Sequence, residues 1–212
     1  MISAPAGAIR REVVVATSNP GKLREIRAIL GDLPIALRGL DAFPEIEFPE
    51  EGDDYEANAA AKAEVVARAT GRAALADDSG LEVDGLEGAP GPRSARFGGP
   101  GLDDGKRAAV LLDAMAGCTG ERRNARFVCV AALATREGEV VTARGECPGR
   151  ILAAPRGAGG FGYDPVFEVA PGTAMAELPP ARKNEISHRA RALRALRGAL
   201  ETIAREPLPP DG

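Results

Sequence analysis

The sequence has few of the residues on which metal clusters, disulfides and covalent catalysis depend. Its 212 residues include three cysteines, one histidine and no tryptophan. Cys118, Cys129 and Cys147 form no CxxC pair, and with His188 as the single histidine no zinc-ligand set can be assembled. A Ser-His-Asp triad is disfavoured for the same reason. Three scattered cysteines are typical of reduced, partly buried thiols in a cytosolic protein.

Long apolar runs and strong basic charge are also missing. The longest apolar stretch, 127–134, is far too short to cross a bilayer. Near the N-terminus, Arg10 and Arg11 follow small residues instead of preceding an apolar core, which is not the pattern of a secretory signal. The net charge is −4 without a long run of Lys and Arg, so neither nucleic acid nor a membrane is an expected partner. The expected compartment is the cytoplasm.

The bulk composition is that of a globular protein, with 44% hydrophobic and 27% charged residues. No linker, low-complexity segment or internal repeat divides the chain. We therefore expect a single domain over 1–212, with loose tails at about 1–10 and 206–212.

The hydrophobic pattern predicts an α/β fold in which helices and strands are interleaved. After a β-branched run, Asn19 supplies an N-cap, Pro20 a first helical position and Gly31 a helix end. Asp53, with Glu56 three residues later, predicts a capping box at the next helix. The expected helices cover 20–30, about 53–69, 103–116 and about 187–204, and the expected strands cover 13–16, 73–76, 126–135 and 140–146.

The turn TSNPGK, Thr17–Lys22, lies between the first strand and the first helix. A helix N-terminus there exposes unpaired N–H groups and the positive end of the helix dipole, which suit phosphate. Ser18 and Asn19 add hydrogen-bond donors, Gly21 permits close approach and Lys22 supplies charge. The GxxxxGK[ST] spacing of a P-loop is absent. Taken alone, the segment favours the alternative of a capped turn with a surface lysine.

Acidic residues gather on both sides of the second expected helix. Glu50 and Glu51 precede it, and Asp77 and Asp78 follow the strand 73–76 in an expected loop. Crowded carboxylates repel each other, so a cation partner is plausible. Magnesium takes one or two protein carboxylates together with water and phosphate oxygens, and one carboxylate from each loop fits that pattern. Helix caps and solvated turn residues are the alternative, which each pair on its own favours.

The segment GGFGYDP, Gly159–Pro165, has the residue types of a binding site for a flat ligand ring. Adjacent glycines beside Phe161 and Tyr163 indicate backbone drawn close to a ring on which an aromatic side chain can stack. An aromatic-anchored turn is the structural alternative.

The segment KNEISHR, Lys183–Arg189, opens the last expected helix. Lys183 and Arg189 carry only donors, and His188 can donate from at least one nitrogen. A donor-lined pocket accepts a purine with a 6-keto oxygen and opposes a 6-amino group with like donors. A basic helix start is the alternative, and the helix dipole disfavours it.

In this order the segments resemble the inosine triphosphatase family, the HAM1-like pyrophosphatases of altered purine nucleotides. The resemblance covers nearly the whole chain, and the set is highly specific although each piece is weak. The matching pieces are TSNPGK at Thr17–Lys22, the EEG…NAxxKA stretch at Glu50–Ala63, ADDSGLEVDGLEGAPG at Ala76–Gly91, GGFGYDP at Gly159–Pro165 and KNEISHR at Lys183–Arg189.

The resemblance implies hydrolysis of dITP, ITP and XTP to the monophosphate and pyrophosphate with magnesium. It also implies an elongated α/β fold, with a mixed sheet flanked by helices and two lobes around a central substrate cleft, usually in a homodimer. Glu50 matches the family's metal-binding glutamate, Asp78 its metal ligand and proton acceptor, and Ser79 a neighbouring substrate contact. The residues implied to bind the triphosphate are Thr17, Ser18, Asn19, Pro20, Gly21, Lys22 and Lys62. Those implied to hold the base are Phe161, Gly162, Tyr163 and Asp164, and those implied to read its keto edge are Lys183, His188 and Arg189.

Two positions depart from the family pattern. Glu51 stands where the family often has Thr, which leaves it open as an alternative metal ligand. Pro92 and Arg93 stand where an aliphatic residue and Tyr usually follow GAPG. The competing hypotheses are a Maf-like pyrophosphatase acting on dTTP or modified pyrimidines, and a nucleotide-binding protein without turnover. The KNEISHR segment argues against the first, and the presence of Glu50 and Asp78 argues against the second.

Overall fold

The computed structural model describes residues 10–206, and a long mixed β-sheet is its main feature. The strands are β1 (Arg11–Val15), β2 (Ile35–Arg38), β3 (Ala73–Val83), β4 (Pro90–Gly91), β5 (Asn124–Ala134), β6 (Val140–Ile151), β7 (Phe167–Ala170) and β8 (Thr173–Ala174). The helices are α1 (Pro20–Leu30), α2 (Tyr55–Thr70), α3 (Asp104–Ala114), α4 (Pro180–Ile186), α5 (His188–Ala195) and α6 (Arg197–Arg205). The tails expected at about 1–10 and 206–212 lie, apart from Arg10 and Glu206, outside the described residues.

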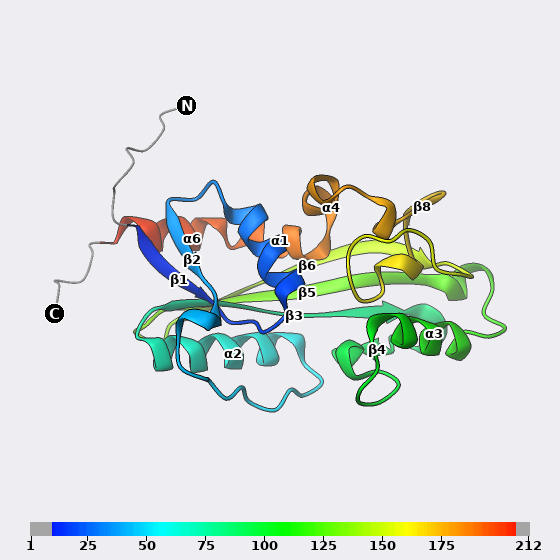
Figure 1. Cartoon of the computed structure of the whole chain (residues 1–212), viewed down its shortest axis with the longest axis horizontal. Helices are drawn as coiled ribbons and strands as arrows, with labels where there is room; N and C mark the ends of the chain where they lie inside the picture. Colours follow the sequence, from blue (N-terminus) through cyan, green and yellow to red (C-terminus); the bar gives the residue numbers. More distant parts are fainter. Residues whose placement is uncertain (1–9, 207–212) are drawn as a thin grey trace.

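The strand order is β2-β1-β3-β5-β6-β7-β8, and β4 pairs with β3 beside this path. β1 is parallel to β2 and β3, and the remaining pairs are antiparallel. The long strands β3, β5 and β6 run along the length of an elongated molecule, with α1 and α6 on one side and α2 on the other (Figure 1). The expected α/β class, an elongated mixed sheet flanked by helices, is confirmed.

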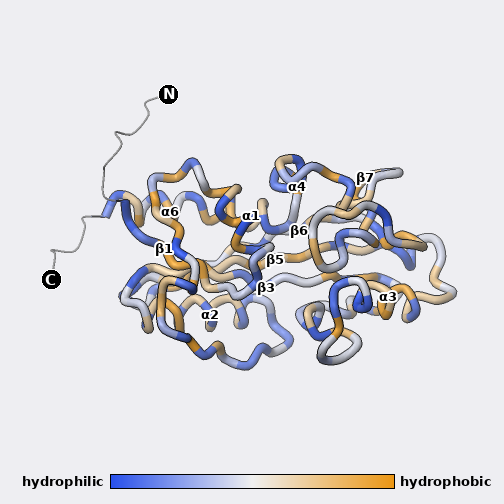
Figure 2. Tube along the Cα trace, viewed as in Figure 1, coloured by the Kyte–Doolittle hydropathy of each residue, from blue (hydrophilic) through white to orange (hydrophobic). Residues whose placement is uncertain are grey.

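Buried apolar side chains form three clusters, because side chains alternate between the two faces of each strand. On one face, Leu75 and Leu133 pack with β1, α1, α5 and α6. Farther along the same strands and on the same face, Leu81 and Phe127 pack with α3 and β7. Helix α2 covers the opposite face, where Val66 lies in the third cluster. Apolar segments of the trace accordingly concentrate along the sheet and its helix contacts (Figure 2). The first face therefore carries two apolar lobes, with polar side chains of β3 between them.

The start of α1 confirms the predicted cap, but the N–H groups expected to be unpaired there are not all free. Asn19 is the N-cap, and its Oδ1 accepts hydrogen bonds from the backbone N–H groups of Gly21 (2.8 Å) and Lys22 (3.1 Å). Pro20 at the first position has no N–H. The expectation of unpaired N–H groups is thus wrong for Gly21 and Lys22, because the cap itself takes their bonds.

The N-cap of helix α2 lies one residue later than predicted. Asp54, not Asp53, accepts from the backbone N–H groups of Glu56 (2.8 Å) and Ala57 (3.1 Å). Asp53 pairs instead with Arg93. The sequence alone does not distinguish the two adjacent aspartates as caps. The ion pair of Asp53 with Arg93, from a distant loop, leaves Asp54 as the cap.

The predicted strand 73–76 is too short, because β3 continues to Val83 and places Asp77 and Asp78 inside the sheet. Paired carboxylates indicate a loop when read alone, since an isolated buried charge is costly. Both carboxylates are buried here, with 2% and 4% exposure, and cations from other elements neutralise them.

The single helix predicted at about 187–204 is two helices in the structure, α5 and α6. Ser187 caps α5, and the chain passes through Leu196 into α6. The short elements β2, β7, β8 and α4 lack a periodic pattern long enough to predict. The cysteines at 118, 129 and 147 are free and buried, as expected. Within residues 10–206, no helix has the length and apolar character needed to cross a membrane.

Candidate functional site

The middle of β3 has an edge that no neighbouring strand covers. β1 pairs with β3 at residues 73–75, and β4 pairs with it at Leu81 and Glu82. Across the described part of the chain, residues 76–80 therefore have no strand partner on that side. Because side chains alternate along a strand, Asp77 and Asp78 project to opposite faces at this gap. A cavity opens beside it.

The cavity brings together most of the predicted site. The predicted residues that line it are Asn19, Lys22, Asp78, Ser79, Phe161, Gly162, Tyr163, Asp164, Lys183, His188 and Arg189. The predicted residues outside this lining are Thr17, Ser18, Pro20, Gly21, Glu50 and Lys62. Two of these still contact the lining, since Gly21 lies against Phe161 and Lys62 binds Asp78.

One end of the site is built by β3 and α2. Oδ1 of Asp78 lies 3.3 Å from Nζ of Lys62, and Oδ2 accepts a hydrogen bond from Asn58 (2.9 Å). Nζ of Lys62 also lies 2.9 Å from Oε1 of Glu51. Burial raises the pKa of Asp78, and the nearby Lys62 ammonium offsets part of that rise. Burial alone would lower the pKa of Lys62, but Asp78 and Glu51 raise it above its ordinary value.

The carboxylates at this end form a small set of oxygen donors. Within residues 10–206, no group of three or more His, Cys, Asp or Glu side chains could hold a metal. Magnesium needs only one or two protein carboxylates when water and phosphate oxygens complete its shell. Asp78 and Glu51 already face one cation, the Lys62 ammonium, so this oxygen donor set fits a metal that binds with a triphosphate.

The two adjacent glutamates differ in their placement. Glu51 lines the cavity and binds Lys62, whereas Glu50 is exposed and is not among the lining residues. The assignment of the metal to Glu50 stays a prediction. The structure places Glu51, which the sequence left open as an alternative, on the same Lys62 ammonium that binds Asp78.

On the other face of β3, Asp77 lies between two cations. Its Oδ2 is 3.0 Å from Nζ of Lys22 and 3.0 Å from Nη2 of Arg189. Ser79 adds a hydrogen bond from Oγ at 2.6 Å. Burial would raise the pKa of Asp77, but Arg189 and Lys22 outweigh it and hold that pKa well below its usual range. The carboxylate is therefore charged and fixes both cations beside the cavity.

The Phe161 ring lies beside the donor-rich end of the cavity. Nζ of Lys183 is 4.6 Å and Cζ of Arg189 is 5.6 Å from its centroid. A Cβ atom at Gly21 would lie only 2.8 Å from the ring, so the glycine of the TSNPGK turn allows the two segments to meet. Asp164 ties the same segment together, since its Oδ2 accepts from Phe161 N (2.9 Å) and Lys183 Nζ (2.5 Å).

His188 lines the cavity as a neutral ring. It stacks on Phe127 with 4.8 Å between ring centroids and an interplanar angle of 16°. Burial, together with the Arg189 and Lys183 charges, holds its pKa well below the ordinary value. Its buried Nδ1 has no hydrogen-bond partner among the described residues. A neutral imidazole carries one N–H, so His188 offers a single donor.

Comparison with known proteins decides the family of this chain. The sequence model of the Ham1 family matches residues 13–199. The chain belongs to the Ham1 family. A dITP/XTP pyrophosphatase of Geobacter sulfurreducens is 50% identical over 190 residues, covering 89% of this chain and 96% of the relative. One of Mycolicibacterium paratuberculosis is 50% identical over 199 residues, covering 91% and 97%.

Solved structures of Ham1 proteins share the fold. A HAM1 protein from Coxiella burnetii is 39% identical, with a TM-score of 0.80 over 91% of this chain and 99% of that one. A nucleoside-triphosphatase / dITP/XTP pyrophosphatase from Mycobacterium abscessus is 44% identical, with a TM-score of 0.71 over 87% and 98%. The architecture predicted from the resemblance is thereby confirmed.

Sequence reasoning missed several residues of this Ham1 site. Phe127 lines the cavity, and so do Asp104 and Arg107 of α3. Arg107 donates to the backbone carbonyl oxygens of Phe97 (2.6 Å) and Leu102 (2.9 Å), which fixes the loop before α3. An arginine in the first turn of a helix is a usable sequence signal, since that position is electrostatically unfavourable unless the side chain has partners.

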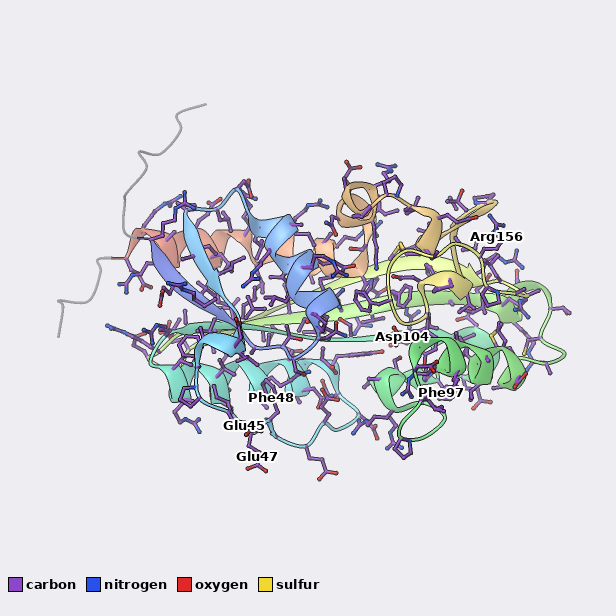
Figure 3. The ribbon with its side chains drawn as sticks, in the orientation of Figure 1. Glu45, Glu47, Phe48, Phe97, Asp104 and Arg156 are labelled. Carbon is purple, nitrogen blue, oxygen red and sulfur yellow. The ribbon has the colours of Figure 1, made fainter. Side chains whose placement is uncertain are left out.

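Asp104 connects α3 to the segment that carries Phe161. Its Oδ2 accepts a hydrogen bond from the backbone N–H of Gly162 at 2.7 Å. In Figure 3, Asp104 lies where α3 faces the loop that precedes β7. Gly160 and Gly162 have positive φ angles of 74° and 62°, so the loop depends on such contacts to hold its shape.

We expect Asp104→Ala to raise the KM for the nucleotide about threefold to tenfold with a smaller change in kcat. One hydrogen bond from a backbone N–H to a charged group contributes roughly 1.5–3 kcal/mol, and exposure of this carboxylate reduces that figure. Steady-state kinetics measure the effect, and Asp103→Ala, which removes the neighbouring helix cap, is the control. A KM unchanged in Asp104→Ala alone would show that the loop holds its shape without this bond.

Proposed function

We propose that this protein hydrolyses altered purine nucleoside triphosphates, such as dITP, ITP and XTP, to the monophosphate and pyrophosphate. The observation that carries the proposal is the division of the cavity at the open edge of β3. Asp78, paired with Lys62, lies on one face of β3, and Arg189, which binds Asp77 on the other face, lies with Lys183 beside the Phe161 ring. The names of the Ham1 relatives, dITP/XTP pyrophosphatases, support the same substrate class.

The base would lie against Phe161. Lys183 and Arg189 carry only donors, and the neutral His188 offers one N–H. The 6-keto oxygen of hypoxanthine or xanthine accepts hydrogen bonds from such groups, whereas the 6-amino group of adenine leaves them unpaired. Discrimination of this kind is strong, because buried polar groups without partners are costly.

The triphosphate would extend from there past Lys22 to Lys62. Charge on these ammonium groups stabilises the pyrophosphate as it leaves. The hydroxyls of Thr17 and Ser18 lie in the same turn, whereas the N–H groups of Gly21 and Lys22 are engaged by Asn19. We therefore assign phosphate recognition at this turn to side chains rather than to the helix amides.

Asp78 would act on the attacking water. It orients the water and accepts its proton while the water oxygen forms a bond to the α-phosphorus and the bond from that phosphorus to the bridging oxygen breaks. The raised pKa of this buried carboxylate suits proton transfer. Magnesium, held by Asp78 with Glu51 or Glu50, would supply positive charge to the phosphate oxygens.

The assembly and the compartment are further parts of the proposal. A homodimer is supported by the family resemblance. A cytoplasmic location is supported by that resemblance and by the three buried free thiols. A single domain over the whole chain stays a prediction.

Release of pyrophosphate from ITP, dITP, XTP, GTP, ATP and dTTP tests the function. We expect kcat/KM for the inosine and xanthosine nucleotides to exceed that for ATP by about a hundredfold or more, and chelation of magnesium to abolish release. Release mainly from dTTP would favour a Maf-like enzyme. Release from no nucleotide would favour a binding protein, and equal rates with ATP and ITP would refute the donor-lined base site.

A further inference from the structure

Glu25 is a buried carboxylate to which the proposed chemistry gives no role. It lies on α1, three residues after Lys22, and is 8% exposed. Its Oε1 is 2.8 Å from Nζ of Lys183, and its Oε2 is 2.5 Å from Nη1 of Arg189. Each oxygen therefore binds one of the two cations beside the Phe161 ring.

The contacts of Lys183 leave donor capacity for a ligand. An ammonium group has three N–H donors. Asp164 accepts a hydrogen bond from one of them at 2.5 Å, and Glu25 forms an ion pair with the ammonium at 2.8 Å in the described structure. The two carboxylates fix the position of this ammonium group, whose side chain lines the cavity.

Arg189 is held in the same way. A guanidinium has five N–H donors. Nε and Nη2 donate to Asp77 at 3.3 Å and 3.0 Å, the second N–H of Nη2 reaches Ser79 Oγ at 3.3 Å, and Nη1 donates to Glu25. One N–H of Nη1 remains, and Glu25 sets its direction.

Glu25 also balances the charge of the cluster. Lys183 and Arg189 repel each other, and both lie within 6 Å of the same ring centroid. Together with Lys22, they face the carboxylates of Asp77, Asp164 and Glu25 in an alternating series of ion pairs. Without Glu25, these three cations would share two carboxylates, and Lys183 and Arg189 would lose their common anchor.

We propose that Glu25 is the positioning residue for base selectivity: it holds Lys183 and Arg189 so that one N–H of each is presented to the 6-keto purine. This inference rests on the proposed function and adds a determinant of its selectivity. Because Glu25 and Lys22 lie one turn apart on α1, the helix that contributes a phosphate-binding lysine also sets the geometry of the base-reading pair.

Glu25→Gln is the direct test. The amide keeps the size of the side chain, loses the charge and cannot accept from both cations. We expect the ratio of kcat/KM for ITP to that for ATP to fall about tenfold to a hundredfold, because small misplacements of binding groups have effects of that size. The loss is expected in the KM for ITP, since a base contact acts equally in the ground and transition states. Glu25→Asp retains the charge and is expected to restore part of the ratio.

The matched control is Glu201→Gln. Glu201 also lies between two arginines, Arg197 and Arg205, but at the surface on α6. We expect its ITP to ATP ratio to match the unmodified protein. If Glu25→Gln is too unstable to assay, Glu25→Asp carries the test, because its shorter side chain cannot reach both nitrogens as the native one does and the ratio should still fall severalfold.

Calorimetric binding of IMP and AMP separates this inference from the proposed function. If the unmodified protein released no pyrophosphate but bound IMP in preference to AMP, the proposed activity would fail, and loss of that preference in Glu25→Gln would still support the positioning role. An unchanged ITP to ATP ratio, or an unchanged IMP preference, in the folded Glu25 variants would overturn it. Equal binding of IMP and AMP by the unmodified protein would overturn it as well.

Discussion

Asp78→Asn is expected to reduce kcat for ITP by about a thousandfold or more while the protein stays folded. The amide has nearly the shape of the carboxylate and can still accept from Asn58, which now donates to Asp78 at 2.9 Å. It cannot accept a proton from water and is a poor metal ligand. The loss therefore falls on the chemical step, and Lys62 retains Glu51 as a partner.

Pyrophosphate release at saturating magnesium measures this loss, and the melting temperature reports the fold. Asp113→Asn is the matched control, because Asp113 is an exposed aspartate on α3 and does not line the cavity. Near-full turnover in Asp78→Asn would assign the base elsewhere. Asp77 would be a poor substitute, since Lys22 and Arg189 hold its pKa well below the usual range.

Two parts of the candidate site could be predicted because each lies in one contiguous segment. In TSNPGK and KNEISHR, the chemistry is in the residue types themselves, and the structure brings Lys22 and Arg189 to one carboxylate. Glu25 could not be predicted in this way. It lies in the middle of an amphipathic helix, where an acidic residue is usually solvated, and only the packing of α1 on α5 and α4 gives it two cations.

The length of β3 could not be predicted for a related reason. Its apolar start is a clear strand signal, but Asp77 and Asp78 interrupt the pattern. Their burial depends on Lys62 from α2 on one face and Arg189 from α5 on the other, which are distant in sequence. Local sequence patterns predict elements whose stability comes from neighbouring residues. The second half of β3 depends instead on cations that distant helices bring to both faces of the strand.

Arg189→Met is expected to lower the free energy of unfolding by about 3–5 kcal/mol, the range for breaking a buried ion pair by removing one partner. Arg189 is 1% exposed, and its donors satisfy Asp77 on one side and Glu25 on the other. Methionine fills much of the same volume but leaves both carboxylates with one cation fewer. For a protein of this size, the melting temperature should fall by about 10 °C.

Arg191→Met is the control for this loss, because Arg191 is exposed on the same helix and donates only to the carbonyl oxygen of Glu146 in the described structure. Its expected effect is within about 1 kcal/mol. The double variant of Arg189→Met with Asp77→Asn then shows whether the loss of stability comes from the unpaired Asp77 carboxylate or from lost packing. If the uncompensated carboxylate causes the instability, neutralising it makes the double variant more stable than Arg189→Met, because the two changes share one interaction. If the decreases in the free energy of unfolding of the two single variants simply add, the instability comes from lost packing around the removed guanidinium. The alternating series of ion pairs would then serve ligand recognition and not stability.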